Sequence, residues 1–321
     1  MDNGSHDESA QMVASEFQNS NTPAVHLLAS DENLGFTGGN NLGLAYLGFD
    51  VPIPKQFATA ELGRQRTGAT SSPLNGRAGP HPRSPQPLPD FVLLLNPDAE
   101  VTDGALFAMA HFLQQTSGAG ACGARLQYGD GRFQHGAFCF PSLAQIVLDF
   151  FPLTGLPGAH RLHDSRANGR YPRRLWASGR PFVVDFVLGA AMMVAGQAIT
   201  EVGGLDDAYF MYCEEMDWCL RLAEAGWSVY AVPSARVIHH EGQSSRKVRW
   251  QAYEWLWRSR FRFYARYRRR YPPGYLAAVR GLVRLGVKVR AAQAHRRFGR
   301  GEINGVELHD ELTTYAAVAR L

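Results

Sequence analysis

An asparagine and an aspartate closely follow a continuous apolar run. Residues 90–95 read DFVLLL and lead into Asn96-Pro97-Asp98. A continuous apolar run of this length is typical of a central strand in a parallel sheet that is covered on both faces. A carboxylate at the carboxyl end of such a strand points into the ligand crevice. Asp98 could therefore hold Mg²⁺ or Mn²⁺ on a nucleotide diphosphate, and the alternative is a turn aspartate that only caps the next helix.

Three acids stand close together at the start of an amphipathic run. They are Glu214, Glu215 and Asp217, and most of the side chains around them are apolar. Burial against apolar side chains raises the pKa of a carboxyl group, which suits a general base. The simpler alternative is that the three acids complement the positive end of a helix dipole.

Two further clusters contain residue types that bind metals or anions. His239 and His240 follow a predicted strand, and an imidazole there could complete a metal site begun by Asp98, although histidine pairs are more often structural. Residues 33–41 read NLGFTGGNN and precede a short predicted helix. Glycines let the backbone approach a ligand, and a helix N-terminus favours anions. A plain tight loop is the more frequent explanation of such a segment.

Strands and helices alternate between these clusters. The patterns predict strands at 24–29, 90–95, 119–125, 182–188 and 228–232. They predict helices at 12–17, 104–115, 199–202 and 213–225, and a short helix that ends near residue 47. Residues 51–89, rich in Pro, Gly, Ser and Arg, are expected to form a disordered or extended insertion, and residues 126–182 are expected to be rich in loops. The alternation predicts a doubly wound α/β sheet, in which ligands bind at the carboxyl ends of the strands.

Composition narrows the class of protein. The chain has 321 residues, of which 45% are hydrophobic, enough for one α/β domain with extensions or for two small domains. Its four cysteines include no CxxC pair, so we expect no disulfide framework or zinc site and a reducing, cytoplasmic compartment. No apolar run is long enough to span a bilayer, and the polar N-terminus is unlike a signal peptide.

Residues 246–270 are strongly basic. They hold ten Lys or Arg residues against one acid, Glu254. Aromatic residues lie among these cations, namely Trp250, Trp255, Trp257, Phe261, Phe263, Tyr264 and Tyr267. A solvated helical face is the simplest interpretation. The mixture also suits peripheral contact with an anionic membrane surface, whereas no motif elsewhere indicates a nucleic-acid partner.

In this order the motifs resemble those of family 2 glycosyltransferases, specifically the bacterial rhamnosyltransferase-like branch. The matching segments are DNGSHD (2–7), NLGFTGGNNLG (33–43), FVLLLNPDAEV (91–101), GAAMMV (189–194), VGGLDDAYFMYCEEMDWCLRLAEAGW (202–227) and VPSARVIHHEGQSS (232–245). The resemblance implies a GT-A fold over residues 1–245, with a mostly parallel sheet flanked by helices. Residues 246–321 are expected to form a basic, aromatic helical extension. Relatives carry a strand, a helix and most of a second strand before the first motif. We therefore expect the first β-α unit to be missing, with a loss of stability or activity.

The resemblance also implies a role for each matching side chain. Glu215 would be the general base of a single inverting displacement, at a position where relatives have aspartate. Asp98 and His239 would hold Mg²⁺ or Mn²⁺, with His240 as the fallback ligand. Glu214 and Asp217 would support the acidic helix, and Tyr212 and Trp218 would pack on sugar rings. The donor would be contacted by Asp2, Asn33, Gly35, Asn40, Asn96 and Asp98.

The branch implies dTDP-rhamnose as the donor and a lipid-linked or cell-wall glycan as the acceptor. Two alternatives stay open. The donor could be UDP-galactofuranose or another UDP-sugar, or the chain could be a non-catalytic remnant that binds a partner or glycan at a membrane. Divalent-dependent binding of dTDP or UDP would separate a transferase from a remnant.

Overall fold

A computed structural model describes residues 1–17, 25–53, 87–151, 159–241 and 248–321. Most of the predicted 51–89 insertion therefore lies outside the described residues. The helices are α1 (Ser9–Phe17), α2 (Gly35–Tyr46), α5 (Ala105–Gln115), α6 (Leu143–Phe150), α7 (Ala159–His163), α8 (Arg173–Ala177), α9 (Gly196–Val202), α10 (Glu214–Glu224), α11 (Arg249–Arg266), α12 (Tyr275–Gly299) and α13 (Gly305–Arg320). The strands are β1 (Asp2–Asn3), β2 (Ala29–Ser30), β3 (Phe91–Leu95), β4 (Ala99–Val101), β5 (Ala119–Gln127), β6 (Phe133–Gln134), β7 (Ala137–Phe138), β8 (Phe182–Val184), β9 (Phe186–Val187), β10 (Ala191–Ala195) and β11 (Ser228–His239).

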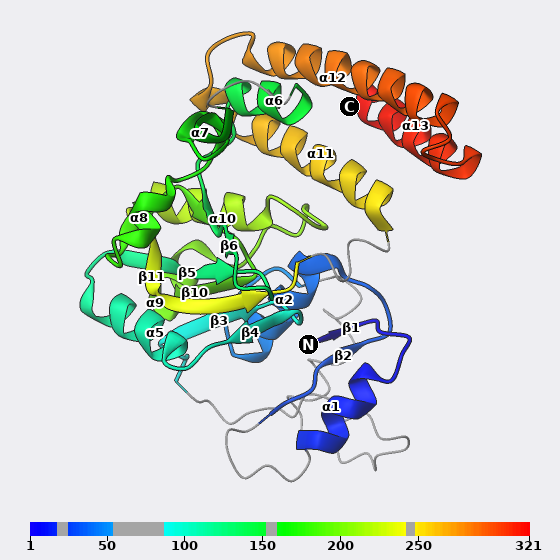
Figure 1. Ribbon diagram of the computed structural model, residues 1–321. Helices are drawn as coiled ribbons and strands as arrows, with labels where there is room; N and C mark the ends of the chain where they lie inside the picture. Colours follow the sequence, from blue (N-terminus) through cyan, green and yellow to red (C-terminus); the bar gives the residue numbers. More distant parts are fainter. Residues whose placement is uncertain (18–24, 54–86, 152–158, 242–247) are drawn as a thin grey trace.

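A seven-stranded sheet occupies the middle of the molecule (Figure 1). Its main path is β3-β10-β5-β11-β4, with β6 paired to β5 and β8 paired to β11. Strands β5 and β11 pair in parallel, and β10 runs antiparallel between β3 and β5. The three strands β3, β5 and β11 therefore point the same way, and their carboxyl ends share one edge. The predicted α/β class is confirmed.

Successive residues of the strands face two different cores. Ala121 and Met192 pack with α9 and α10 on one face, whereas Cys122 and Met193 pack with α5 on the other. Neighbouring side chains of a strand point to opposite faces, so a sheet covered on both sides needs apolar residues at every position. This two-sided burial is why the strand sequences show little polar alternation.

The helices α11, α12 and α13 form a further layer together with α6 (Figure 1). Met216 and Leu220 of α10 enter the same apolar cluster, so α10 links this layer to the sheet. Among the aromatic residues of 246–270, the buried ones are Trp257, Phe261, Phe263, Tyr264 and Tyr267. These five rings form the core between the helices, so contact of residues 246–270 with a membrane would fall to the exposed side chains of this segment.

The N-termini of two helices in this layer are capped as their sequences suggest. Ser142 accepts a hydrogen bond from the backbone N–H of Gln145 at the start of α6. Asn304 and Glu307 form a reciprocal capping box at the start of α13. Such caps satisfy backbone N–H groups that have no partner within the helix.

Several predicted strands differ in extent. The strand expected at 24–29 is reduced to β2, which pairs in parallel with β1, and Ala24 lies outside the described residues. The strand expected at 228–232 continues to His239 as β11. The run at 91–95 is not central, because within the described residues β3 pairs only with β10 and forms an edge. Strand β10 was not predicted.

The segments around 126–188 also differ from expectation. Residues 126–182 hold the strands β6 and β7 and the helices α6, α7 and α8 rather than loop alone. The strand expected at 182–188 is broken at Asp185, whose carboxylate accepts the backbone N–H of Phe140 and the hydroxyl of Tyr171. The backbone N–H of Asp185 donates to the hydroxyl of Tyr171 at 3.0 Å instead of to a neighbouring strand, which is consistent with the break.

The four cysteines are buried free thiols. Across the described ranges, none of the helices combines the length and the apolar character that crossing a bilayer would require.

Candidate functional site

Asp98 and His239 lie side by side at the carboxyl edge of the sheet. Oδ1 of Asp98 is 3.4 Å from Nε2 of His239, and both side chains are largely buried. Asp98 lies just beyond β3, and His239 is the last residue of β11. The short strand β4 pairs with β11 so that Ala99 stands opposite His239. This antiparallel pairing brings together two residues that are distant in the sequence.

Gln134 of β6 orients the imidazole of His239. Its Oε1 atom lies 3.2 Å from Nδ1, and its side chain is buried. A carboxamide oxygen only accepts hydrogen bonds, so this contact favours the tautomer with the proton on Nδ1, in which Nε2 keeps its lone pair. Nε2 faces Asp98 and the amide of Asn96, whose Nδ2 lies 3.4 Å away. A histidine that binds a metal through one nitrogen is typically held in this way through the other.

The Asp98 and His239 pair suits a divalent cation that is shared with a substrate. Within the described part of the chain, no three His, Cys, Asp or Glu side chains converge on one point. Asp98 and His239 thus offer one oxygen and one nitrogen ligand. Mg²⁺ and its analogues commonly take few protein ligands and complete their shell with water and substrate phosphates. The donor set therefore fits a cation that bridges protein and diphosphate.

His240 points away from Asp98. Its Nε2 atom lies 2.6 Å from Oε1 of Glu100, and both side chains are exposed. Neighbouring residues of a strand face opposite sides, so His239 and His240 cannot both reach the same ion. The expectation that His240 serves as the fallback metal ligand is wrong.

Glu214 and Glu215 open α10 as a pair of buried acids. Their exposed fractions are 4% and 9%, and Oε2 of each has no hydrogen-bond partner among the described residues. Burial raises the pKa of Glu215 to about 7. Burial, together with the neighbouring Glu215, raises the pKa of Glu214 well above its usual range. Glu215 therefore exchanges protons near neutral pH more readily than an ordinary glutamate does, and Glu214 holds its proton more tightly than an ordinary glutamate.

The backbone before these acids is strained. Tyr212 and Cys213 have φ values of 68° and 67°, in the left-handed region that side chains with a Cβ rarely adopt. Such conformations persist only where the surrounding structure imposes them, and they cluster at functional sites. Here the strained pair turns the chain into α10 and sets the direction in which Glu214 and Glu215 leave the backbone. Tyr212 itself is half-buried.

Helix α10, which Glu214 and Glu215 open, runs back along β11, away from the carboxyl edge of the sheet where Asp98 and His239 lie. Helix α10 contacts β11 and is joined to it by a short turn at 225–227, so the helix begins near the edge where the strand ends. The carboxyl end of β3, which carries Asp98, belongs to that edge as well. In open α/β sheets, ligands bind at this edge.

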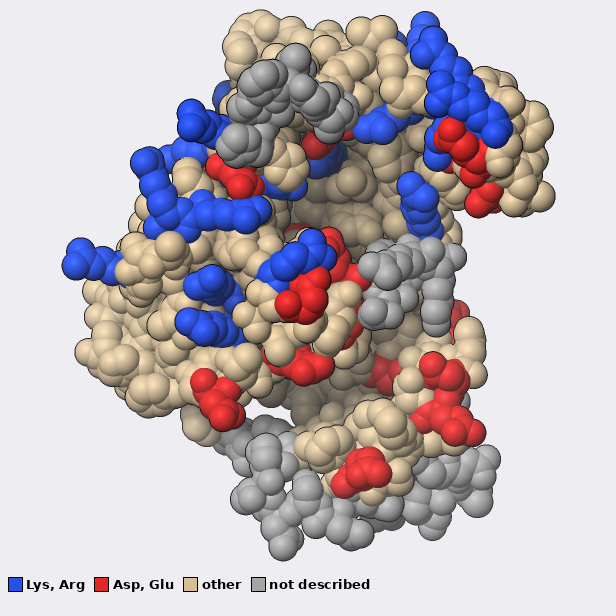
Figure 2. All heavy atoms as spheres, viewed as in Figure 1, with Lys and Arg blue, Asp and Glu red and all other residues tan. Residues whose placement is uncertain are grey.

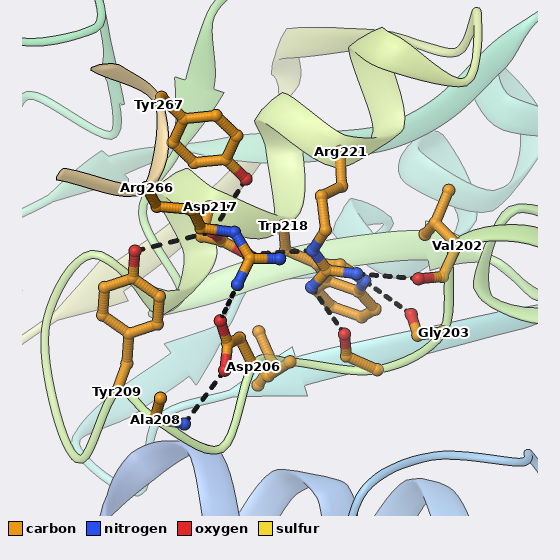
Figure 3. A network of polar contacts seen from close by, with 12 residues as sticks. Val202, Gly203, Asp206, Ala208, Tyr209, Asp217, Trp218, Arg221, Arg266 and Tyr267 are labelled. Carbon is orange, nitrogen blue, oxygen red and sulfur yellow. Dashed lines mark hydrogen bonds and ion pairs between the residues drawn. The ribbon is translucent and has the colours of Figure 1, made fainter. Parts of the chain in front are cut away.

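Asp217 anchors α10 to the end of α11 (Figure 3). Its carboxylate is fully buried and accepts hydrogen bonds from Nε of Arg221 at 2.8 Å and from the hydroxyl of Tyr267 at 2.8 Å. Nε of Arg266 lies 3.3 Å from the same group. Two cations and a hydroxyl around a buried carboxylate compensate for the hydration that the carboxylate loses. The geometry gives Asp217 a structural part in holding the helix.

Trp218 is placed in the core. Its side chain is fully buried, and its indole N–H donates to the carbonyl of Gly203 at 2.8 Å. Arg221 binds the same loop through the carbonyls of Val202 and Gly204 (Figure 3). The expectation that Trp218 packs on a sugar ring is wrong, because a large ring with a satisfied N–H fills the space between α10 and this loop.

Asn3, Asn33 and Gly35 form a second group at the start of α2, and Asp2, predicted to contact the donor, precedes Asn3 in β1. Asn3 donates to the carbonyl of Gly35 at 2.9 Å, and Asn33 accepts the N–H of Gly35 at 2.9 Å. Gly35 has a φ of +70°, and a Cβ there would lie 2.2 Å from the carbonyl oxygen of Phe210. Only glycine fits this position. Through Phe210, the group touches the loop that leads to Glu214.

The two asparagines that follow have different partners. Asn40 donates from its amide to the carbonyl of Phe36 within α2. Asn41 is buried and both donates to and accepts from the backbone of Leu205. Asn41 therefore ties α2 to the loop before α10. Asn40 was predicted to contact the donor, but its amide is used inside its own helix.

Sequence comparison gives two informative matches. No family model matches the chain. N-acetylglucosaminyl-diphospho-decaprenol L-rhamnosyltransferase of Mycobacterium tuberculosis is 29% identical over 249 residues, which cover 76% of this chain and 66% of the relative. Rhamnosyltransferase WbbL of Escherichia coli is 41% identical over 86 residues, or 27% of this chain and 33% of the relative. The chain thus spans just under two thirds of the length of the mycobacterial relative.

Structure comparison gives a more distant match. A crystal structure of GalNAc-T7 with UDP, GalNAc and Mn²⁺ shares 12% sequence identity with the chain, at a TM-score of 0.42. The match covers 73% of this chain and 36% of the other.

Proposed function

We infer that this chain is a rhamnosyltransferase-like member of glycosyltransferase family 2 and that it transfers a sugar from a nucleotide-diphosphate donor to an acceptor hydroxyl. The observation that carries the proposal is the contact between Asp98 and His239, with His239 held by Gln134. An oxygen and an oriented nitrogen at the ligand-binding edge of an α/β sheet suit a metal-bound diphosphate.

The relatives guide the choice of sugar and acceptor. One is named for L-rhamnosyl transfer to an N-acetylglucosaminyl-diphospho-decaprenol, and the other is named a rhamnosyltransferase. We therefore propose rhamnose, supplied as dTDP-rhamnose, as the transferred sugar and a lipid-linked glycan as the acceptor. A UDP-sugar such as UDP-galactofuranose is the alternative donor. Asn33 and Gly35, at the N-terminus of α2, and Asp2, next to their partner Asn3, are proposed to contact the nucleotide.

Glu215 is proposed to act as the general base. Its carboxylate accepts the proton of the acceptor hydroxyl while that oxygen forms a bond to the anomeric carbon. The bond from the anomeric carbon to the phosphate oxygen breaks on the opposite side, and the nucleotide diphosphate leaves with the electron pair. One displacement therefore inverts the configuration. The proton then passes from Glu215 to solvent.

Asp98 and His239 are proposed to hold Mg²⁺ or Mn²⁺. When bound, the cation would supply Lewis-acid stabilisation of the charge on the departing diphosphate. Gln134 keeps the proton of His239 on Nδ1, so Nε2 stays available as a ligand. Asn96 lies beside Nε2 and is proposed to contact the donor.

A lipid-linked acceptor would bring the chain to a membrane surface. We propose that exposed arginines near the end of α11, such as Arg268 and Arg269, face anionic lipid there. Aromatic insertion is not part of this proposal, because most of the aromatic rings around these arginines are buried.

Calorimetry with dTDP and UDP, in Mn²⁺ and in EDTA, tests the nucleotide part of the proposal. We expect Mn²⁺-dependent binding of dTDP. A donor-hydrolysis panel with dTDP-rhamnose and several UDP-sugars then identifies the sugar. No nucleotide binding at all would favour the remnant alternative, and nucleotide binding without turnover of any donor would likewise overturn the proposed transfer.

A further inference from the structure

A cavity of about 500 Å³ lies among α11, α12 and α13. Its lining includes Arg249, Arg290, Arg296, Arg297 and Arg300. None of the residues proposed to act in sugar transfer lines it. Figure 2 shows that Lys and Arg predominate over the part of the molecule where these helices lie, whereas Asp and Glu gather mainly over the lower part.

Most of this positive charge is uncompensated. Glu302 is the one acid that lines the cavity, and its carboxylate lies 3.6 Å from the guanidinium of Arg300. Arg297 forms an ion pair with Glu311, which does not line the cavity. Arg249, Arg290 and Arg296 have no carboxylate partner within the ranges that the structure describes. Arg249 stacks over the ring of Trp250, and Arg290 donates to the backbone carbonyl of Asp149. Converging guanidinium groups without carboxylates are the usual recognition device for phosphate.

A second chamber of about 380 Å³ adjoins the first. The two share Arg249, Trp250, Arg290 and Tyr315. The second chamber adds Phe150, Leu256 and Trp257, and its acid, Asp149, pairs with Arg260 at 2.8 Å. A cationic chamber is thus continuous with one rich in aromatic and aliphatic side chains. Both volumes lie in the range of small-molecule sites.

We propose that these joined chambers bind an amphiphilic organic phosphate, with the phosphate among the arginines and the apolar part over Trp250 and Trp257. The phosphate group is the shared chemistry, and a membrane lipid headgroup or a soluble organic phosphate could present it. The inference does not rest on the proposed sugar transfer, because it uses other residues and another part of the fold.

Calorimetry on the full chain with dihexanoyl phosphatidic acid, below its micellar concentration, tests the site. The tested variant is Arg296→Gln/Arg300→Gln. The matched control is Arg280→Gln/Lys288→Gln, which removes the same charge from exposed positions of α12 outside both chambers. We expect the tested variant to bind about tenfold more weakly or worse, because charge-assisted hydrogen bonds are lost, and the control to stay within about twofold.

Glycerol 3-phosphate serves as the probe without an apolar part and should bind more weakly than dihexanoyl phosphatidic acid. Equal losses in the two variants would show diffuse attraction and overturn the proposal. Absence of binding by the unmodified chain at millimolar dihexanoyl phosphatidic acid would overturn it as well.

Cosedimentation with vesicles separates the two sources of phosphate. Vesicles of phosphatidylcholine with phosphatidylglycerol, compared with phosphatidylcholine alone, are tested with the same pair of variants. Loss of sedimentation in the Arg296→Gln/Arg300→Gln variant alone supports the site with a membrane lipid as its ligand. Unchanged sedimentation, together with weakened binding of the soluble probe, supports the site with a soluble organic phosphate as its ligand.

Discussion

The Oε1 atom of Gln134 lies 3.2 Å from Nδ1 of His239, and this contact decides which imidazole nitrogen can bind a metal. Replacing Gln134 with leucine removes the acceptor and leaves a buried N–H without a partner. We expect the Gln134→Leu chain to bind Mn²⁺ in the presence of dTDP about 10- to 100-fold more weakly. Electron paramagnetic resonance of Mn²⁺ measures this directly.

The Gln134→Glu variant is the matched control, because its carboxylate still accepts from Nδ1. It should retain most of the affinity for Mn²⁺. If leucine and glutamate reduce the affinity equally, Gln134 only fills space and the tautomer argument is wrong.

Glu215→Gln should abolish transfer while nucleotide binding persists. The amide cannot accept the acceptor proton, so the rate should fall by about 10²- to 10⁴-fold. The dissociation constant for dTDP in Mn²⁺, measured by calorimetry, should stay within about twofold. A variant that retains near-normal turnover would remove Glu215 from the mechanism.

The rate of transfer should depend on pH through the same side chain. Burial raises the pKa of Glu215 to about 7, and the group acts as a base only when it is deprotonated. We therefore expect kcat/KM to rise with pH through about 7 and to level off above it. A profile that stays flat between pH 6 and pH 8 would contradict this assignment.

The buried acids should also make stability depend on pH. Because burial raises the pKa of Glu215 from 4.5 to about 7, the folded chain binds the proton more tightly than the unfolded chain. The stabilisation that protonated Glu215 gives the folded chain is complete below pH 4.5 and is lost as the pH rises through 7. The free energy of unfolding should therefore fall by about 3 kcal/mol over this range. Urea unfolding at pH 5 and pH 8 measures this difference.

The Glu214→Gln/Glu215→Gln variant should show a smaller fall in the free energy of unfolding between these two pH values. The exposed substitution Asp310→Asn should leave the fall unchanged. An identical pH dependence in all three chains would mean that the two acids are not buried as charged groups at alkaline pH.

Removal of the charge of Asp217 should destabilise the fold. Asp217→Asn leaves Arg221 and Arg266 without their buried carboxylate partner, and we expect a loss of about 3–5 kcal/mol in the free energy of unfolding. The comparison variant is Glu254→Gln, which breaks the solvent-accessible pair with Arg258 at the same spacing on α11 and should cost at most about 0.5 kcal/mol. Similar losses in the two variants would contradict the structural role given to Asp217.

Much of the fold could be predicted from local patterns. The helices α5 and α10 and the strands β3 and β5 have long apolar patterns, and their sequences alone locate them closely. Whether a strand lies at the edge of the sheet, and how long it is, depends on pairing between segments that are distant in the sequence. A single sequence does not reveal this pairing. Strand β10 was missed because its alanines and methionines carry no strong strand preference, although both of its faces are buried.

The candidate site, like the fold, could be predicted only in part from the sequence. Asp98 and His239 could be paired from their residue types and from their places after strands. Trp218 could not be told from a sugar-stacking ring, because only packing against Gly203 shows that it is buried. Gln134 was missed, although the sequence did carry a signal. The Gly129-Asp130-Gly131 turn is typical of a hairpin, and recognising it would have placed Gln134 beside the carboxyl end of β5.

The most direct test compares His239→Ala with His240→Ala. The two histidines are neighbours, but only the imidazole of His239 lies near the Asp98 carboxylate, whereas the imidazole of His240 pairs with Glu100. Calorimetry of dTDP binding in Mn²⁺ should show a loss of about tenfold or more for His239→Ala and less than about twofold for His240→Ala. Equal effects of the two substitutions, or binding that does not depend on Mn²⁺, would contradict the proposed metal-diphosphate site.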